Sequence, residues 1–527
     1  MKTTKSFWGI FFIFLLLHTV LVLNIEFFPF SDVPNHLAEG AIFRYYNESS
    51  NWFKQYYTLH YLFYPNTFHL YFFSFPLFPD VEVANKVLHL LIVVSLPVLV
   101  LLVIRELKGN PWFALVAFVL VYGYNLTFGF TGNAVANNVI LLLIWLWLRT
   151  INQKSSGFVN MVAISVLLLF VYFLHAMVAL FCLLMMFSFI AFRFRDNFVK
   201  LVQYSLALVP LGLLVLYWWF FIQNAVESST AYSTQETSTL AYMKEYYKAE
   251  FWQTYFSRSM FLYADNSQLF VGKLGKATGF LLSASILIPI CLLLYKHVFI
   301  HKRRTTWGRF LNTDDANNYM LLFMIVAAGC YFLLPIRIPG QEPLYERFST
   351  ILLLALIFIS CKVPEINSRL FSYAASVVAL AHLLLWGDYF RQFDQDNSNF
   401  AKVLPTDTDK VLTYMNYDPA YRGRNVYDHF QNYFIVWNKG IATSKVIDYR
   451  FGMIRRHEQG DLPYQEHMYY NDYDPKDMIK KSDYILVRGD MSEQHQQLVS
   501  SLGSFVKVKQ VDKWHLLKRT EANIALD

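Results

Sequence analysis

Long apolar runs separated by short basic loops occupy the chain from residue 7 to residue 387. Most of the runs approach the roughly 20 residues that a helix needs to cross a bilayer core. The eleven runs lie near 7–28, 84–104, 111–130, 132–149, 158–174, 176–192, 200–223, 276–297, 318–335, 348–362 and 369–387. With the N-terminus inside, every strongly basic short loop falls on one side of the membrane, as the positive-inside rule requires. The pattern predicts a mainly α, polytopic membrane protein with about eleven spans, a cytoplasmic N-terminus and an extracytoplasmic C-terminus.

Three apolar stretches admit more than one interpretation. The first, 7–28, could be a signal peptide, but it exceeds a typical h-region of about 7–15 residues and is interpreted as a retained span. Residues 158–192 have basic residues at both ends, which favours two spans with a turn near His175. Residues 61–79 are rich in aromatic residues and contain three prolines. Counting them as a span would invert every later loop, so we expect an interfacial or re-entrant segment.

Polar residues collect in three long segments on the predicted outer side: the first outer loop 29–83, residues 224–275, and a tail from 390 to 527. Two apolar stretches in the tail, 410–414 and 484–488, read as strands; 492–502 has a helical pattern and 505–518 the pattern of a β-hairpin. We therefore predict a helical transmembrane domain over 1–389 and a small C-terminal α/β domain over 390–527 on the outer face.

Composition supports a membrane protein and excludes several other classes. Hydrophobic residues make up 55% of the 527 residues and charged residues 16%, against about 25% in soluble domains. The mean hydropathy of +0.32 excludes disorder and a soluble enzyme. A net charge of +7 is small for this length and fits basic inner loops rather than a nucleic-acid-binding surface. All four cysteines lie in or beside apolar runs, so no disulfide framework is indicated.

Candidate chemistry is concentrated at the start of the first outer loop, which reads Ser31-Asp32-Val-Pro34-Asn-His36-Leu-Ala-Glu39. Asp32 follows the first span directly, and Asp is a preferred helix N-cap when proline occupies the first turn. A carboxylate beside His36 and Glu39 at helical spacing could equally serve as a general base or a metal ligand. The sequence therefore leaves Asp32 open either as a helix cap or as a functional group, that is, a general base or a metal ligand. It shows no HExxH-type metal motif.

The opening Asp32-Val-Pro34-Asn-His36 and the span layout resemble the GT-C class of glycosyltransferases, which includes protein O-mannosyltransferases and lipid A aminoarabinose transferases. Looser matches are Pro65 to His69, Gly129 to Asn133, and Leu334 to Phe348. The resemblance extends over about residues 1–390 as layout. It implies a helical bundle in a bacterial inner membrane that transfers a sugar from a polyprenyl-phosphate donor to a lipid, glycan or protein acceptor.

The resemblance also implies roles for individual residues. Asp32 would be the catalytic base, with His36 or Glu39 in support, and Arg347 or Arg337 would bind the donor phosphate. Arg347 could instead be a snorkelling anchor or a partner of Glu346. His69 and His175 would line the substrate cavity or serve structure alone. No cofactor is fixed by the sequence; a divalent cation, Mg²⁺ or Mn²⁺, stays open, with Asp32 as its candidate ligand.

Three other functions compete with sugar transfer from a lipid monophosphate. A transporter or lipid flippase would show charges near the middle of spans, broken helices and hydropathy repeats, and few such features are present. A polymerase or ligase using diphosphate-linked oligosaccharides would share the same outer-face chemistry. A membrane scaffold that only carries the tail domain would need no acidic residue at position 32. The sequence favours the transferase and leaves these alternatives open.

Overall fold

The chain forms two compact units. The first, here called the membrane unit, comprises Met1–Asn24, His89–Thr127 and Thr131–Tyr389, and the second, the loop–tail unit, comprises Ile25–Leu88, Phe128–Phe130 and Phe390–Asp527. The computed structural model describes residues 5–60, 63–152, 157–223, 243–244, 246–247, 258, 312–336, 338, 343–362, 368–444, 447, 452–457, 476–503 and 505–520.

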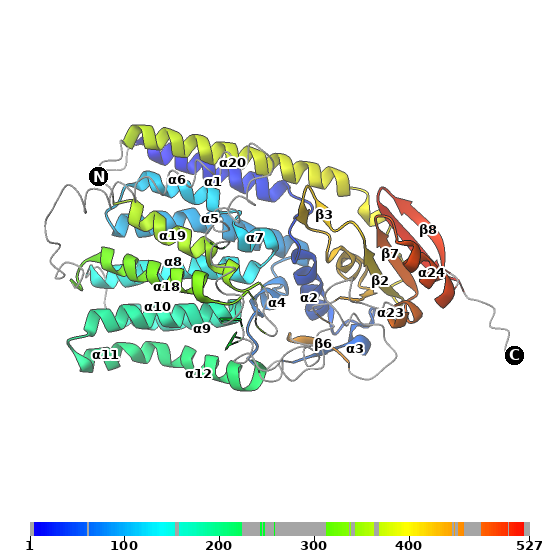
Figure 1. Ribbon diagram of the computed structural model, residues 1–527, viewed down its shortest axis with the longest axis horizontal. Coiled ribbons are helices and arrows are strands. Elements are labelled where there is room, and N and C mark those ends of the chain that lie inside the picture. Colours follow the sequence, from blue (N-terminus) through cyan, green and yellow to red (C-terminus); the bar gives the residue numbers. More distant parts are fainter. Residues whose placement is uncertain are drawn as a thin grey trace. The chain divides into compact units, whose positions relative to one another are not determined.

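Long helices build the described part of the membrane unit (Figure 1). They are α1 (Lys5–Asn24), α5 (Val81–Glu106), α6 (Ala114–Leu120) with α7 (Tyr124–Phe128), α8 (Thr131–Ile151), α9 (Gly157–Leu174), α10 (Ala176–Phe194), α11 (Phe198–Ser205) with α12 (Val209–Tyr217), α18 (Ala316–Leu333), α19 (Ser349–Ser360) and α20 (Ser368–Asn397). Phe12, Leu16 and Leu384 are 59%, 61% and 64% exposed. Apolar side chains at such positions fit contact with lipid rather than with water.

Nine helices within the described ranges are long and apolar enough to cross a membrane, which confirms a polytopic membrane protein. The stretch 158–192 divides into α9 and α10 at His175, as predicted. Residues 68–73 form only the six-residue helix α4 (Phe68–Phe73), so the aromatic segment is not one of the nine. The predicted span 276–297 lies outside the described residues.

The predicted span 348–362 is shorter than expected. Its helix α19 has 12 residues, which reach about 18 Å at 1.5 Å per residue. The preceding four residues, Tyr345–Phe348, form a buried 3₁₀ turn. Glu346 and Arg347 lie in that turn, so the α-helix begins only after the charged pair.

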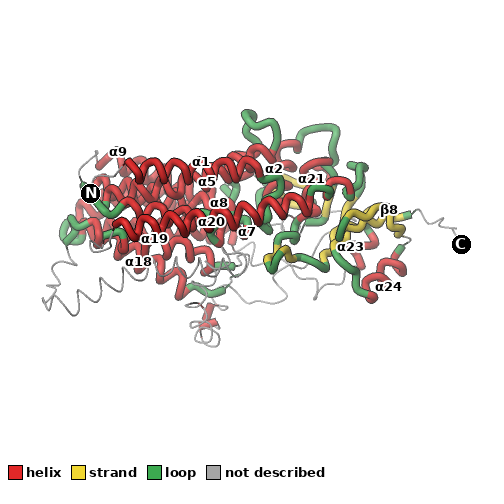
Figure 2. The backbone as a smooth tube through the Cα atoms, turned by 90° about the horizontal axis from the view of Figure 1, so that it is seen from above, coloured by secondary structure: helices red, strands yellow, loops and turns green. Residues whose placement is uncertain are grey.

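The described strands all belong to the loop–tail unit (Figure 2). Its main sheet has the order β5-β2-β7-β9-β8, formed by β5 (Ile441–Ala442), β2 (Val411–Asn416), β7 (Tyr484–Arg488), β9 (Trp514–Arg519) and β8 (Phe505–Val511). The first three are parallel and the last two pair antiparallel. Helix α24 (Glu493–Leu502) begins after Ser492, whose hydroxyl accepts from the amide of His495. The two predicted strands, the helix and the hairpin of the tail are thus confirmed.

The first loop folds together with the tail in this unit. It contributes α2 (Val33–Tyr45), α3 (Phe53–Tyr56), β1 (Tyr57–Leu59) and α4. Strand β1 pairs antiparallel with β6 (Ile454–Arg456), and α2 packs against the tail helix α21 (Tyr433–Asn438). Outside the pairing, Lys439 of the tail lies 2.6 Å from Glu48 of the loop. The first loop and the tail are therefore one packed body rather than a loop and a separate appendage.

Candidate functional site

Asp32 occupies the residue before helix α2, but its carboxylate does not cap the helix. The backbone there is αR, with φ −88° and ψ −9°, and the side chain makes no capping hydrogen bond. An N-cap residue usually has β-region angles, which aim its side chain at the first amides of the helix. Instead, Oδ1 of Asp32 lies 3.5 Å from Nε2 of His429. Asp32 therefore does not serve as the helix cap.

Ser31 and Asp32 of the first loop lie beside Asp428 and His429 of the tail. The hydroxyl of Ser31 donates to Oδ2 of Asp428 at 3.2 Å, beside the contact of Asp32 with His429. The side chain of His429 is 3% exposed and that of Asp32 is 22% exposed. The carboxylate of Asp32 is thus partly exposed to solvent, and a buried imidazole lies beside one of its oxygens. Asp428 and His429 were not among the predicted site residues, because a polar pair in a tail loop is typical of any solvated turn.

A buried amide–hydroxyl network fixes α2 against the tail one turn beyond Asp32. Oδ1 of Asn35 accepts from Nδ2 of Asn432 at 3.3 Å and from the hydroxyl of Ser444 at 3.0 Å. The three residues are at most 1% exposed. Buried polar groups are costly unless they are paired, so such a network holds its elements in a single register.

Gly129 packs closely against the backbone of Asp32. Its φ is +100°, and a Cβ atom there would lie 2.7 Å from the amide nitrogen of Asp32 and 2.9 Å from that of Val33. The Asp32 amide also donates to the carbonyl of Phe128 at 3.0 Å. Only glycine satisfies both the backbone angle and the close approach. The start of α2 is thus positioned by a turn that lies about 100 residues later in the chain.

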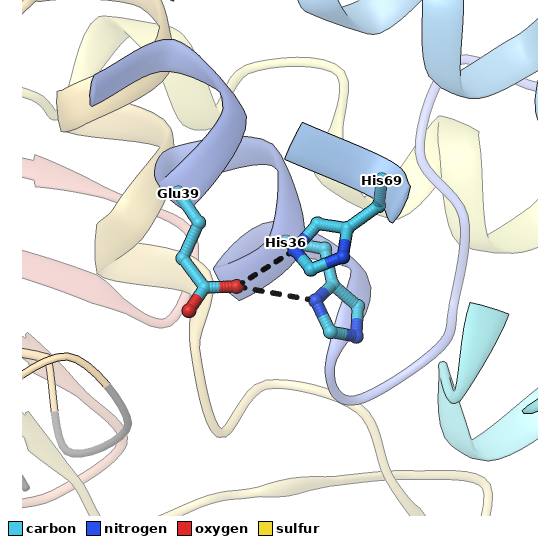
Figure 3. A group of neighbouring side chains, drawn as sticks. All are labelled: His36, Glu39 and His69. Carbon is cyan, nitrogen blue, oxygen red and sulfur yellow. Dashed lines mark hydrogen bonds and ion pairs between the residues drawn. The ribbon is translucent and has the colours of Figure 1, made fainter. Parts of the chain in front are cut away.

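His36, Glu39 and His69 form a second cluster in the same unit (Figure 3). Oε2 of Glu39 is 3.3 Å from Nδ1 of His36 and 3.0 Å from Nε2 of His69. The first two residues lie on α2 and the third on α4, and both rings are turned toward one carboxylate oxygen. Glu39 and His69 are 8% and 6% exposed. The spacing in the sequence predicted that His36 and Glu39 share one helix, but His69 comes close to them only through the packing of α4 against α2.

The electrostatics of this cluster favour an ionised carboxylate. Burial raises the pKa of Glu39, but the hydrogen bonds from His36 and then His69 outweigh it, and the pKa is lowered to about 2. Burial, followed by the charge of His36, lowers the pKa of His69 from its ordinary value. At neutral pH, Glu39 is therefore a carboxylate that accepts an N–H from a neutral His69.

Arg347 and His175, both predicted to bind substrate, contact each other in the membrane unit. A terminal nitrogen of Arg347 lies 2.7 Å from Nε2 of His175, and its Nε donates to the carbonyl of Pro343 at 2.7 Å. Burial and then the charge of Arg347 hold the pKa of His175 well below its usual range. The imidazole is thus a neutral acceptor that orients the guanidinium. Arg337 lies outside the described residues.

The tail also carries an open cavity of about 440 Å³ within the loop–tail unit. Its lining includes the aromatic residues Tyr421, Tyr427 and Trp514, and the charged residues Asp396 and Lys513. Tyr427 and Trp514 are almost fully buried and the guanidinium of Arg488 lies over both rings, so a ligand would meet mainly the polar and charged side chains.

A comparison with solved structures finds similarity, whereas the two sequence comparisons find none. No protein-family model matches the chain, and no curated protein sequence matches it. The cryo-EM structure of the arabinofuranosyltransferase AftD from mycobacteria is similar to this chain with a TM-score of 0.49 and 10% sequence identity. The similarity covers 98% of this chain and 42% of that protein, so the chain spans less than half of its length.

Proposed function

We propose that the protein is a membrane glycosyltransferase of the GT-C type, which transfers a sugar from a polyprenyl-phosphate donor to an acceptor hydroxyl at the outer face of a bacterial inner membrane. The observation that carries the proposal is the side chain of Asp32, which leaves the capping position and faces His429. The motif from Asp32 to His36, with its resemblance to that class, supplies the type of reaction.

Asp32 would act as the general base. The acceptor oxygen attacks the anomeric carbon, its proton passes to a carboxylate oxygen of Asp32, and the bond from that carbon to the phosphate oxygen breaks with its electron pair on the phosphate. His429 would orient the carboxylate, since it lies 3.5 Å from Oδ1 and is almost fully buried. Asp428, held by Ser31, would supply a second acidic group. Glu39 is engaged by two histidines, so we assign it no part in the proton transfer.

Arg347 would stabilise the departing phosphate. A guanidinium is always protonated in proteins, and this one is held at Nε by a carbonyl and at one terminal nitrogen by a neutral imidazole. A fixed cation acts on charge that develops during bond breaking without reorganising at that moment. The second arginine of the sequence prediction, Arg337, remains a proposal from the resemblance alone.

The tail would contribute to acceptor recognition. Its open cavity is lined by polar and charged side chains, which can form hydrogen bonds with hydroxyl groups, and the first loop that carries Asp32 is paired to the same unit through β1 and β6. A glycan or glycolipid acceptor therefore fits better than a purely apolar lipid.

The proposal is tested by measuring sugar transfer from a panel of radiolabelled polyprenyl-phosphate sugars, with purified wild type and with Asp32→Asn. We expect the isosteric variant to lose about 10²- to 10⁴-fold in kcat, the usual contribution of a general base. Asp490→Asn, at an exposed position of the tail, is the matched control and should keep full activity. Undiminished transfer by a correctly folded Asp32→Asn protein would rule out the assigned base.

Transport is the main alternative to sugar transfer. Lipid flipping in proteoliposomes without any sugar transfer would favour that alternative.

A further inference from the structure

The cluster of His36, Glu39 and His69 has no part in the transfer step proposed above. One ligand-type atom from each residue lies within 4.8 Å of the other two. Two imidazole nitrogens and one carboxylate oxygen form the donor set of many catalytic zinc sites, which keep a fourth position open.

The spacing of these atoms fits a small tetrahedral ion. With metal–ligand bonds of about 2.0–2.1 Å, the ligand atoms of a zinc site are separated by about 3.3 Å. Oε2 of Glu39 lies 3.3 Å from Nδ1 of His36 and 3.0 Å from Nε2 of His69. Both pairs are therefore close to the separation that the ion requires. The two nitrogens, within 4.8 Å of each other, would have to approach by up to about 1.5 Å through ring rotation to complete the triangle.

The helices that carry the ligands are held together independently of any ion. A Cβ on Gly40 of α2 would lie 2.7 Å from the ring of Phe73, so the helices approach closely at that point. Arg44 of α2 donates to the carbonyl of Phe73 at 3.2 Å and to that of Phe78 at 2.7 Å. Ligands on such a fixed frame lose little freedom when an ion binds.

We propose that His36, Glu39 and His69 bind one divalent transition-metal ion, with zinc as the preferred ion and a fourth position open to water. The ligands would be Nδ1 of His36, Oε2 of Glu39 and Nε2 of His69. Imidazole nitrogens select zinc over Mg²⁺, which takes oxygen ligands almost exclusively. The ring protons now directed at Glu39 would move to the other nitrogen of each ring.

The burial pattern indicates where the open position lies. The side chain of His69 is 8% exposed and that of Glu39 is 11% exposed, but that of His36 is 20% exposed. Solvent therefore reaches the cluster on the side of His36. The ion would link α2 to α4 within the first loop, one helical turn beyond Asp32.

Metal content of the intact protein tests the site without reference to transferase activity. Purified wild type is stripped with a chelator, loaded with Zn²⁺ and desalted, and its metal is measured by mass spectrometry; Co²⁺ loading adds an absorption spectrum that reports coordination geometry. We expect one ion per chain and a tetrahedral Co²⁺ spectrum. Excess Mg²⁺ should not displace the ion.

Variants separate this site from other places where metal could bind. Glu39→Gln keeps the shape of the side chain, and it should lose the bound ion, as should His69→Ala. His60→Ala removes an exposed histidine of the same loop and should retain the ion, and so should Asp32→Asn. A wild type that stays metal-free after loading, or His69→Ala that keeps its ion while Asp32→Asn loses it, would overturn the proposal.

Discussion

Replacing Gly129 by alanine should displace the carboxylate of Asp32, the proposed base, while leaving the residue itself unchanged. The new Cβ would lie 2.7 Å from the amide nitrogen of Asp32, whereas ordinary contact begins at 3.4 Å. The opposing atoms are backbone, which cannot swing aside as the end of a flexible side chain does. The start of α2 must therefore retreat by several tenths of an ångström, up to about 0.7 Å.

The expected effect on catalysis follows from that displacement. A misplacement of about 1 Å at a reacting group can reduce the rate by about 10²-fold, so we expect Gly129→Ala to lose roughly 10- to 100-fold in kcat. The positive φ adds a separate penalty of about 1–3 kcal/mol in stability. The two effects must be separated before the loss of rate can be assigned to the position of Asp32.

Gly423→Ala is the matched control, because Gly423 also has a positive φ of +81° but no atom lies within 4 Å of the point that its new Cβ would occupy. Transfer kinetics and thermal unfolding in detergent are measured for both variants. The control should lose stability and keep kcat, whereas Gly129→Ala should lose both. If Gly129→Ala matches the control in kcat, then either the turn does not position Asp32 or Asp32 is not the base.

Two further substitutions test Arg347 and the network around Asn35. Arg347→Lys keeps the charge but loses the N–H at Nε and the planar guanidinium directed at His175. The kcat/KM for the sugar donor should therefore fall about 10-fold or more, and a value equal to wild type would rule out Arg347 in phosphate binding. Asn35→Ala removes the oxygen that accepts hydrogen bonds from Asn432 and Ser444. Thermal unfolding should show a loss of about 1–3 kcal/mol in stability, and an unchanged melting temperature would show that the network does not stabilise the fold.

The membrane helices and the tail strands could be predicted because single segments carry their signal. A span must present apolar side chains along about 20 residues whatever its neighbours are. The strands β2 and β7 are buried throughout, and buried strands read as apolar runs bounded by polar residues. Helix α19 departed from its predicted length because hydropathy averages over the charged turn at Glu346 and Arg347.

The candidate site could be predicted only in part, since its contacts join segments almost 400 residues apart. Sequence indicated Asp32, but could not decide between a cap and a base, because aspartate suits both roles. The αR backbone at Asp32 and its missing capping hydrogen bond argue against the cap, and the role of base is our proposal. Strands β1 and β6 have three residues each, too few to show a period, so nothing in the sequence joined the loop to the tail.

The pairing of β1 with β6 has a consequence for biosynthesis. Tyr57 is opposite Arg456, so the first strand leaves the ribosome about 400 residues before its partner, a delay of roughly 20–80 s at 5–20 residues per second. During that time the membrane helices are made while the edge of β1 has no strand to pair with. A nascent chain that stops before β6 cannot form this sheet, so β1 pairs only once synthesis has reached the tail.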